Sequence, residues 1–162
     1  MGLLKILFGD KNEIAFWNEV KEKDDAYPKN SISILMVRTG SGKPGTGWVD
    51  KGYLNYNYKK FCPYYFLIKV DLTDTIAKSN PDLDMGTIEN YFVDNLRKIC
   101  VSHMVARLVS DTGFSIEMYA ETNFLILRKL QSMQTDNNRL VSFEVAIKKD
   151  PKWTVIDRLL TL

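Results

Sequence analysis

The feature that most constrains the fold is the order of hydrophobic patterns between Pro63 and Trp153. Four runs with strand-like alternation are interrupted by two runs with helical spacing, in the order strand, helix, strand, tight turn, strand, helix, strand. This order is that of a split β-α-β unit. We therefore expect an α+β fold, specifically a ferredoxin-like two-layer sandwich of β-α-β-β-α-β type, with two amphipathic helices packed on one face of a sheet.

The individual runs support this order. Residues 63–71 alternate, which places Tyr64, Phe66, Ile68 and Val70 on one face of a strand. A helix from about residue 84 to residue 100 has a buried stripe at Ile88, Phe92, Leu96 and Ile99. Asp111-Thr112-Gly113 joins two alternating runs, which is typical of a β-hairpin.

The chain of 162 residues, 45% of them hydrophobic and 26% charged, has the size and composition of one globular domain. We divide it into an N-terminal helical segment (1–30), a β extension (31–61), the ferredoxin-like core (62–153) and a C-terminal helical tail (154–162). The formal net charge of +2 is too small to indicate a dedicated nucleic-acid binder.

Location and metal content are also constrained by composition. The apolar run near the start, Leu3–Phe8, is too short to span a bilayer, and we expect an amphipathic segment that docks on the domain. Cys62 and Cys100 are expected to be buried free thiols in a reducing compartment, so we place the protein in the cytoplasm. These two cysteines and the single histidine, His103, are too few for a typical zinc site, and we expect no metal or cofactor.

Two motifs that resemble catalytic or nucleotide sites do not satisfy the chemistry. The loop from Thr39 to Gly45 resembles part of a phosphate loop, but Val37 replaces the required glycine and Pro44 follows Lys43. We interpret it as a hairpin loop. His103 is the only side chain with an ordinary pKa near neutrality, and it has no partner nearby in the sequence, so we expect a packed or solvated histidine.

Alternation also assigns residues to the sheet face that the helices leave free. We expect this face to carry Tyr65, Lys69, Arg107, Glu117, Tyr119 and Glu144. Two carboxylates on one face have the chemistry for acid–base catalysis, whereas opposite charges on neighbouring strands are also ordinary cross-strand pairs.

The segment leading into the core interleaves aromatic and basic side chains. Tyr53, Tyr56, Lys59, Lys60 and Tyr65 lie within it. Such a surface can stack on bases or grip a peptide, although strand alternation alone also explains the pattern.

Several of these features together resemble the bacterial family catalogued as domain of unknown function 695. The resemblance covers about residues 32–153 and rests on Gly42-Lys43-Pro44-Gly45-Thr46-Gly47, the aromatic run to Pro63-Tyr64-Tyr65, and Glu89, Arg107, Tyr119, Asp150 and Trp153. That family has no established activity. Some of its members are joined to a domain similar to the ribonuclease E inhibitor B family, which implies a protein-binding or RNA-metabolism regulatory role.

We therefore expect a non-enzymatic cytoplasmic binding or regulatory protein that acts through its open sheet face and its aromatic–lysine segment. The candidate binding residues are Tyr53, Tyr56, Lys59, Lys60, Tyr65, Arg107, Glu117, Tyr119 and Glu144, and none is assigned a catalytic role. The alternatives are a small hydrolase or transferase that uses the sheet-face carboxylates with His103, and an immunity or antitoxin-like protein. The expected partner is a protein, with RNA as the alternative, and an edge strand near residues 140–148 or in the β extension offers a route to a homodimer.

Overall fold

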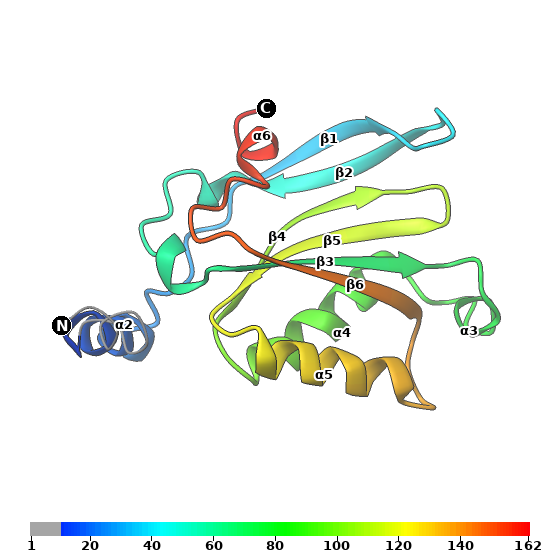
Figure 1. The fold of residues 1–162 in the computed structure, drawn as a ribbon. Helices are drawn as coiled ribbons and strands as arrows, with labels where there is room; N and C mark the ends of the chain where they lie inside the picture. Colours follow the sequence, from blue (N-terminus) through cyan, green and yellow to red (C-terminus); the bar gives the residue numbers. More distant parts are fainter. Residues whose placement is uncertain (1–10) are drawn as a thin grey trace.

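The computed structural model describes residues 11–162, which form one six-stranded antiparallel sheet with helices (Figure 1). The strand order is β1-β2-β4-β5-β3-β6. The strands are β1 (Ile32–Arg38), β2 (Pro44–Asp50), β3 (Tyr64–Asp71), β4 (Ser102–Val109), β5 (Gly113–Ala120) and β6 (Ser142–Lys149). The α-helices are α2 (Lys11–Glu22), α3 (Thr75–Lys78), α4 (Met85–Arg97), α5 (Phe124–Thr135) and α6 (Asp157–Leu160), and the 3-10 helices are η1 (Lys51–Tyr53) and η2 (Lys59–Phe61). The α+β class predicted from the sequence is confirmed.

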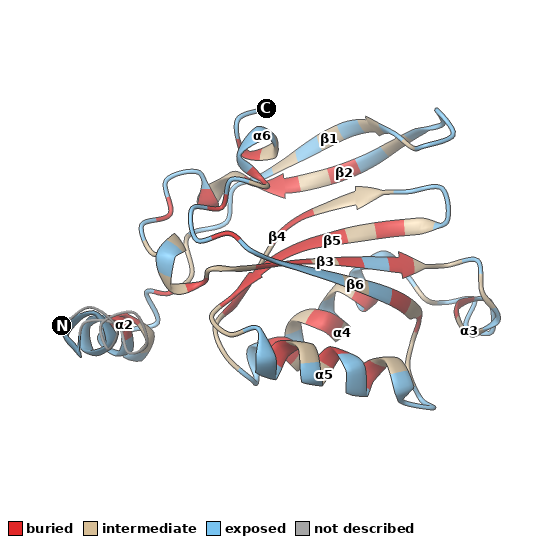
Figure 2. Ribbon diagram, in the orientation of Figure 1, coloured by how far each residue is buried: buried red, intermediate tan, exposed pale blue. Residues whose placement is uncertain are grey.

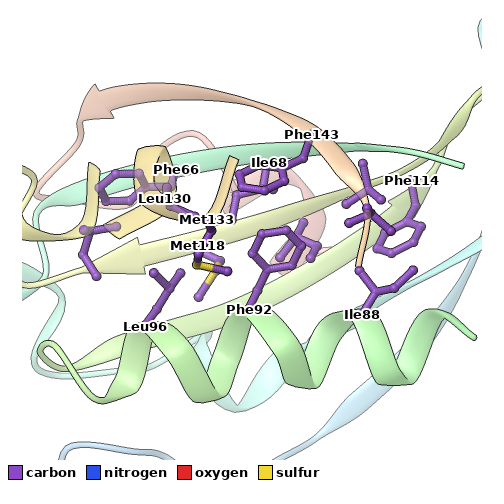
Figure 3. Close-up of a cluster of buried hydrophobic side chains, with 14 of the residues drawn as sticks. Phe66, Ile68, Ile88, Phe92, Leu96, Phe114, Met118, Leu130, Met133 and Phe143 are labelled. Atoms are coloured by element: carbon purple, nitrogen blue, oxygen red, sulfur yellow. The ribbon is translucent and has the colours of Figure 1, made fainter. Parts of the chain in front are cut away.

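The main core lies between one face of the sheet and the helices α4 and α5 (Figure 3). The helix stripe at Ile88, Phe92 and Leu96 is fully buried against the strands, as its spacing predicted. The prediction is wrong for Ile99, which is 37% exposed because α4 ends at Arg97. Helix α4 begins where the Asp84 carboxylate accepts a hydrogen bond from the Thr87 N–H at 2.7 Å, an N-cap that satisfies a free backbone donor. The strands contribute Phe66, Ile68, Val70, Phe114, Ile116, Met118 and Phe143.

A second core covers part of the opposite face of the sheet. Residues of helix α2, the 3-10 turns and the C-terminal segment belong to this cluster, and Figure 2 shows buried positions in these segments as well as in the strands. The Trp17 ring stacks on Phe61 with centroids 4.8 Å apart, and its indole N–H donates to Glu121 at 3.0 Å. The cluster contains Trp17, Val20, Ala26, Val49, Tyr53, Tyr56, Cys62, Tyr65, Val105, Ala106, Tyr119, Trp153, Ile156 and Leu160.

Trp153 fixes the C-terminal segment over this face. Its ring stacks on Tyr119 with centroids 4.0 Å apart and an interplanar angle of 11°, and its indole N–H donates to the Cys62 carbonyl at 2.9 Å. The residue has φ of 60°, in the left-handed region that side chains other than glycine rarely adopt. Such a conformation persists only where surrounding contacts over-determine it.

A β-bulge in β4 changes which side chains share a face. Met104 pairs with Met118 and Ala106 pairs with Glu117, so Val105 is an extra residue without a partner in β5. Because side chains alternate along a strand, one extra residue moves every later side chain to the other face. The prediction that Arg107 lies on the face away from the helices is therefore wrong.

The segment predicted as a β extension, residues 31–61, contains strands only in its first part. β1 and β2 form a hairpin, and β2 continues the sheet beyond β4 through the pairs Gly47–Leu108, Trp48–Arg107 and Val49–Ala106. Gly47 permits this approach, since a Cβ there would lie 2.5 Å from the Arg107 carbonyl oxygen. Residues 51–61 are not extended as predicted, because Asp50 accepts hydrogen bonds from the N–H groups of Ser31 and Gly52 and turns the chain into η1.

Within residues 11–162, no helix has the length and apolar character needed to cross a membrane. The expectation for Leu3–Phe8 falls outside the described residues.

We predict that Trp153→Ala lowers the free energy of unfolding by about 3–5 kcal/mol, because it removes a buried ring and leaves a strained turn. Trp153→Phe keeps a ring and loses the indole hydrogen bonds, so the expected loss is smaller, about 1–3 kcal/mol. Urea denaturation measures both values. Lys152→Ala, at an exposed neighbouring position, is the control and should change stability by less than about 0.5 kcal/mol. A comparable loss in the control, or none in Trp153→Ala, contradicts the role assigned to the stack.

Candidate functional site

The part of the sheet face that the second core does not cover contains a cavity of about 540 Å³. It lies over the β3, β5 and β6 segments nearest the β4–β5 hairpin. Its polar lining consists of one ammonium group, three carboxylates and four hydroxyls, from Lys69, Asp71, Glu117, Glu144, Ser110, Thr112, Ser115 and Ser142.

Strand register positions the charged groups. Lys69 on β3 pairs with Ser115 on β5 and with Glu144 on β6, so these three residues form one row across the sheet. Glu117 lies two residues further along β5, opposite Leu67. Residues two apart on a strand share a face, so Glu117 and Ser115 open onto the same side as Lys69.

Glu117 is the buried member of the group, with 7% of its surface exposed. Its Oε2 accepts a hydrogen bond from the Tyr65 hydroxyl. Burial raises the pKa of Glu117 above its usual value, and the hydrogen bond from Tyr65 opposes this only in part. A carboxyl group of this kind exchanges protons closer to neutrality than an ordinary glutamate.

Lys69 and Glu144 are exposed, and their side chains form no hydrogen bond or ion pair with residues 11–162. Asp71 is engaged locally, since it accepts hydrogen bonds from the N–H and hydroxyl of Thr73, both at 2.7 Å. When Glu117 is ionised, the lining has three negative charges and one positive charge. The cavity therefore favours a cationic group over an anionic one.

A second cavity, of about 350 Å³, lies between β2 and α4, and its charged groups already have partners. Glu89 pairs with Arg107 at 2.5 Å, and Asp50 accepts two backbone hydrogen bonds. The Arg97 guanidinium lies 4.5 Å from the centre of the Tyr27 ring. The sheet-face cavity is the better candidate because its exposed charges are available to a ligand.

The tyrosines predicted to form a binding surface are buried instead. Tyr53, Tyr56, Tyr65 and Tyr119 expose at most 8% of their surface, because they pack in the second core against one another and against Trp153. The Tyr119 hydroxyl donates to Asp150 at 2.6 Å. The expectation that these rings form an open aromatic surface is therefore wrong for all four.

The lysines of the same segment are placed differently. Lys60 is exposed and pairs with Glu13 of α2, while the Lys59 ammonium group donates to the Leu54 carbonyl at 3.3 Å. Both lie away from the sheet-face cavity. They fasten the aromatic segment rather than extend the candidate site.

Arg107 faces the helices as a consequence of the bulge. Its guanidinium donates to Glu89 of α4 at 2.5 Å, and the Trp48 indole N–H donates to the same carboxylate oxygen at 3.2 Å. Arg107 and Glu89 connect β4 to α4, so Arg107 is not part of the cavity.

His103 lies in the second core and does not line the cavity. Its Nδ1 lies 3.1 Å from the Tyr53 hydroxyl and its Nε2 lies 3.1 Å from the Tyr56 hydroxyl. The Tyr56 hydroxyl donates to the Ala26 carbonyl at 2.6 Å, so it accepts from His103. The ring is therefore the neutral Nε2–H tautomer, and Tyr53 donates to Nδ1. Burial lowers the pKa of His103 to about 3, with a smaller contribution from Arg97.

Comparison with protein-family models, with curated proteins and with solved structures finds no match for this chain. The resemblance to the domain of unknown function 695 family thus remains a prediction from the residues named above. Among residues 11–162, no three His, Cys, Asp or Glu side chains are grouped in a way that could hold a metal ion.

Sequence reasoning identified two of the cavity carboxylates, Glu117 and Glu144, and the alternation placed Lys69 on their face. It did not identify the hydroxyls of Ser110, Thr112, Ser115 and Ser142. Alternation places Ser115 beside Glu117, so that signal was present in the sequence. Ser110 and Thr112 lie beside the hairpin turn, where alternation does not determine side-chain direction.

We predict that His103 makes the protein less stable in acid. The unfolded histidine titrates near 6.5 and the folded one near 3, so between these values only the unfolded state binds the proton. The free energy of unfolding should fall as pH drops through this window, by up to about 1.4 kcal/mol per pH unit. His103→Gln keeps a donor and an acceptor without titrating, and urea denaturation should show a shallower slope. Equal slopes in the two proteins contradict this prediction.

We predict the opposite pH dependence for Glu117. Because the pKa of the folded carboxyl is raised, the folded state keeps its proton at pH values where the unfolded state has lost it. The contribution of Glu117 to stability is full below 4.5 and is lost as pH rises through the folded pKa. Glu117→Gln still accepts from Tyr65 and should be more stable than the wild type at pH 7, by about 1 kcal/mol. A destabilised variant at pH 7 with normal folding at pH 4 contradicts the assignment.

Proposed function

We propose that this chain is a non-enzymatic binding protein whose sheet-face cavity receives a lysine or arginine side chain from a partner polypeptide. The observation that carries the proposal is the lining of this cavity, in which three carboxylates face one ammonium group and the exposed charges have no protein partner. A cationic side chain would complete these interactions.

Each lining group has a distinct part in this proposal. Glu144 is exposed at the rim and attracts the incoming cation. Glu117 is buried, so a charge-assisted hydrogen bond to it forms in a less polar environment and is stronger. A bound cation would also favour ionisation of Glu117, so affinity should rise with pH through the Glu117 pKa. Lys69 opposes a second cation and so limits the site to one basic residue.

An acid–base enzyme is the second candidate. Glu117, with its raised pKa, and Glu144 line the same cavity, as a hydrolase or transferase that uses two carboxylates requires. His103 has no part in this version because it is buried in the second core. Binding is preferred because the cavity hydroxyls lack a strong base. The Ser142 hydroxyl donates to the Asp74 carboxylate, but hydrogen bonds lower the pKa of Asp74 below its usual value, which makes it a weak base.

Two finer assignments belong to the same proposal. The strand order β4-β5-β3-β6, with α4 and α5 on one face of the sheet, supports a ferredoxin-like core. This core is formed by the part of the chain that runs from the start of β3 to the end of β6. The two free cysteines, Cys62 and Cys100, support a reducing compartment and hence a cytoplasmic location.

Binding is tested with fluorescently labelled peptides of Gly, Ser and Lys, and with matched peptides in which Gln replaces Lys. We expect the Lys peptide to bind and the Gln peptide to bind at least tenfold more weakly, since a hydrogen bond between charged groups contributes about 1.5–3 kcal/mol. Glu144→Gln and Glu117→Gln should each weaken binding of the Lys peptide by roughly tenfold or more. Fluorescence anisotropy measures these affinities.

Glu22→Gln is the matched control, because Glu22 is an exposed carboxylate on α2 far from the cavity in sequence and outside its lining. Its affinity for the Lys peptide should equal that of the wild type. Equal binding of the Lys and Gln peptides would overturn the proposal. So would preferential binding of single-stranded RNA, which would direct attention to the basic hollow between α4 and α5 that includes Lys98, Arg128 and Lys129.

A further inference from the structure

The two edges of the sheet differ in their protection against pairing with another chain. On the β6 edge the strand carries Glu144, Lys148 and Lys149, and charged side chains on an edge strand oppose such pairing. On the β1 edge the run Ile-Ser-Ile-Leu-Met-Val has no charge and no proline, and the first charged residue is Arg38. Among residues 11–162, β1 pairs only with β2.

The unpaired backbone groups of β1 can be assigned from its hydrogen bonds at both ends. Ser31 accepts from the Lys51 N–H at 2.8 Å, and the Thr39 N–H donates to Lys43 at 2.9 Å, so odd-numbered residues point their backbone groups toward β2. Direction alternates along an antiparallel strand. The N–H and C=O groups of Ile32, Ile34, Met36 and Arg38 therefore point outward from the sheet.

The same residues also carry an apolar row. Ile32, Ile34 and Met36 expose 53%, 70% and 79% of their surface, on the face of the sheet that holds Trp48. β1 lies at the end of the sheet away from α5 (Figure 1), and exposed positions recur along the strand (Figure 2). Of these three residues, Ile32 lines the cavity beside α4, whereas Ile34 and Met36 do not. Free backbone groups and exposed apolar side chains thus coincide on one edge.

We propose that two copies of this chain pair antiparallel through β1, about a two-fold axis at Leu35, and form one continuous sheet. In this register Ile34 lies opposite Met36 of the second copy, and Ile32 lies opposite Arg38. The backbone N–H and C=O groups of Ile32, Ile34, Met36 and Arg38 point away from β2. The two residues of each pair therefore donate one backbone hydrogen bond to each other and accept one. Leu35 faces its own counterpart as the central pair without hydrogen bonds.

A second copy fits this edge for reasons of charge and shape. The two Arg38 side chains lie at opposite ends of the pairing, about 20 Å apart along the strands, so they do not repel each other strongly. Ile32, Ile34 and Met36 of one copy lie on the same face of the joined sheet as the same residues of the other copy, so the two apolar rows lie side by side. A pairing confined to the seven residues of β1 is smaller than a standard interface of about 1,600 Å², so the dimer should be weak and depend on concentration.

Sedimentation equilibrium of the full chain tests the proposal. The wild type should show twice the mass of the chain at high concentration and dissociate on dilution. Ile34→Lys places a charge in the row, and Met36→Pro removes an outward N–H that β2 does not use. Each should weaken dimerisation at least tenfold, whereas Ile14→Lys, the same change at an exposed position of α2, should not affect it.

Engineered cysteines test the register without relying on those variants. Leu35→Cys should form a disulfide between copies under mild oxidation, because central pairs of this type have Cα atoms about 4.5 Å apart. Ser33→Cys should form no such disulfide. In this register Ser33 of the second copy lies four residues further along the strand, about 13 Å from Ser33 of the first. The wild type, with Cys62 and Cys100, gives the background. A wild type that stays monomeric at every concentration, a dimer unaffected by both β1 variants, or cross-linking at Ser33→Cys instead of Leu35→Cys overturns the proposal.

Discussion

The stack of Trp153 on Tyr119 is the interaction on which the arrangement of the sheet face depends. It fastens the C-terminal segment over one part of that face, and Asp150 secures the same turn by accepting hydrogen bonds from Tyr119, Thr154 and the Val155 N–H. Burial alone would raise the pKa of Asp150, but these hydrogen bonds outweigh it and lower the pKa below its usual value. With this part of the face closed, only the part near the β4–β5 hairpin is left for a ligand.

His103 and Glu117 are buried titratable groups of that face, and their different surroundings give them different capacities. His103 is enclosed by aromatic rings and both of its nitrogens have a partner, so it is held neutral and has no free atom for chemistry. Glu117 has one hydrogen bond from Tyr65 and borders the cavity. Burial disfavours the charged form of the Glu117 carboxyl group. A cationic ligand in the cavity would stabilise that charged form.

Five of the residues on which the predicted family resemblance rests contact one another in two places. Glu89 and Arg107 pair between α4 and β4, while Tyr119, Asp150 and Trp153 form the closure of the second core. Both groups hold elements of the fold together and neither lines the sheet-face cavity. The cavity and the β1 edge are therefore carried by other residues, and a shared scaffold would not by itself imply a shared ligand.

The sequence by itself determined the α+β class, the helix stripe at Ile88, Phe92 and Leu96, and the inward faces of β3, β5 and β6, because local periodicity sets which side chains a regular element buries. Only the tertiary structure decided the position of Arg107, since the bulge at Val105 depends on pairing with β5, and the burial of Tyr53 and Tyr56, since their cover comes from segments distant in sequence. The position and the lining of the cavity also depend on the tertiary structure. Its lining joins three strands and a hairpin, and the neighbours of a strand are fixed by the whole fold rather than by its own sequence.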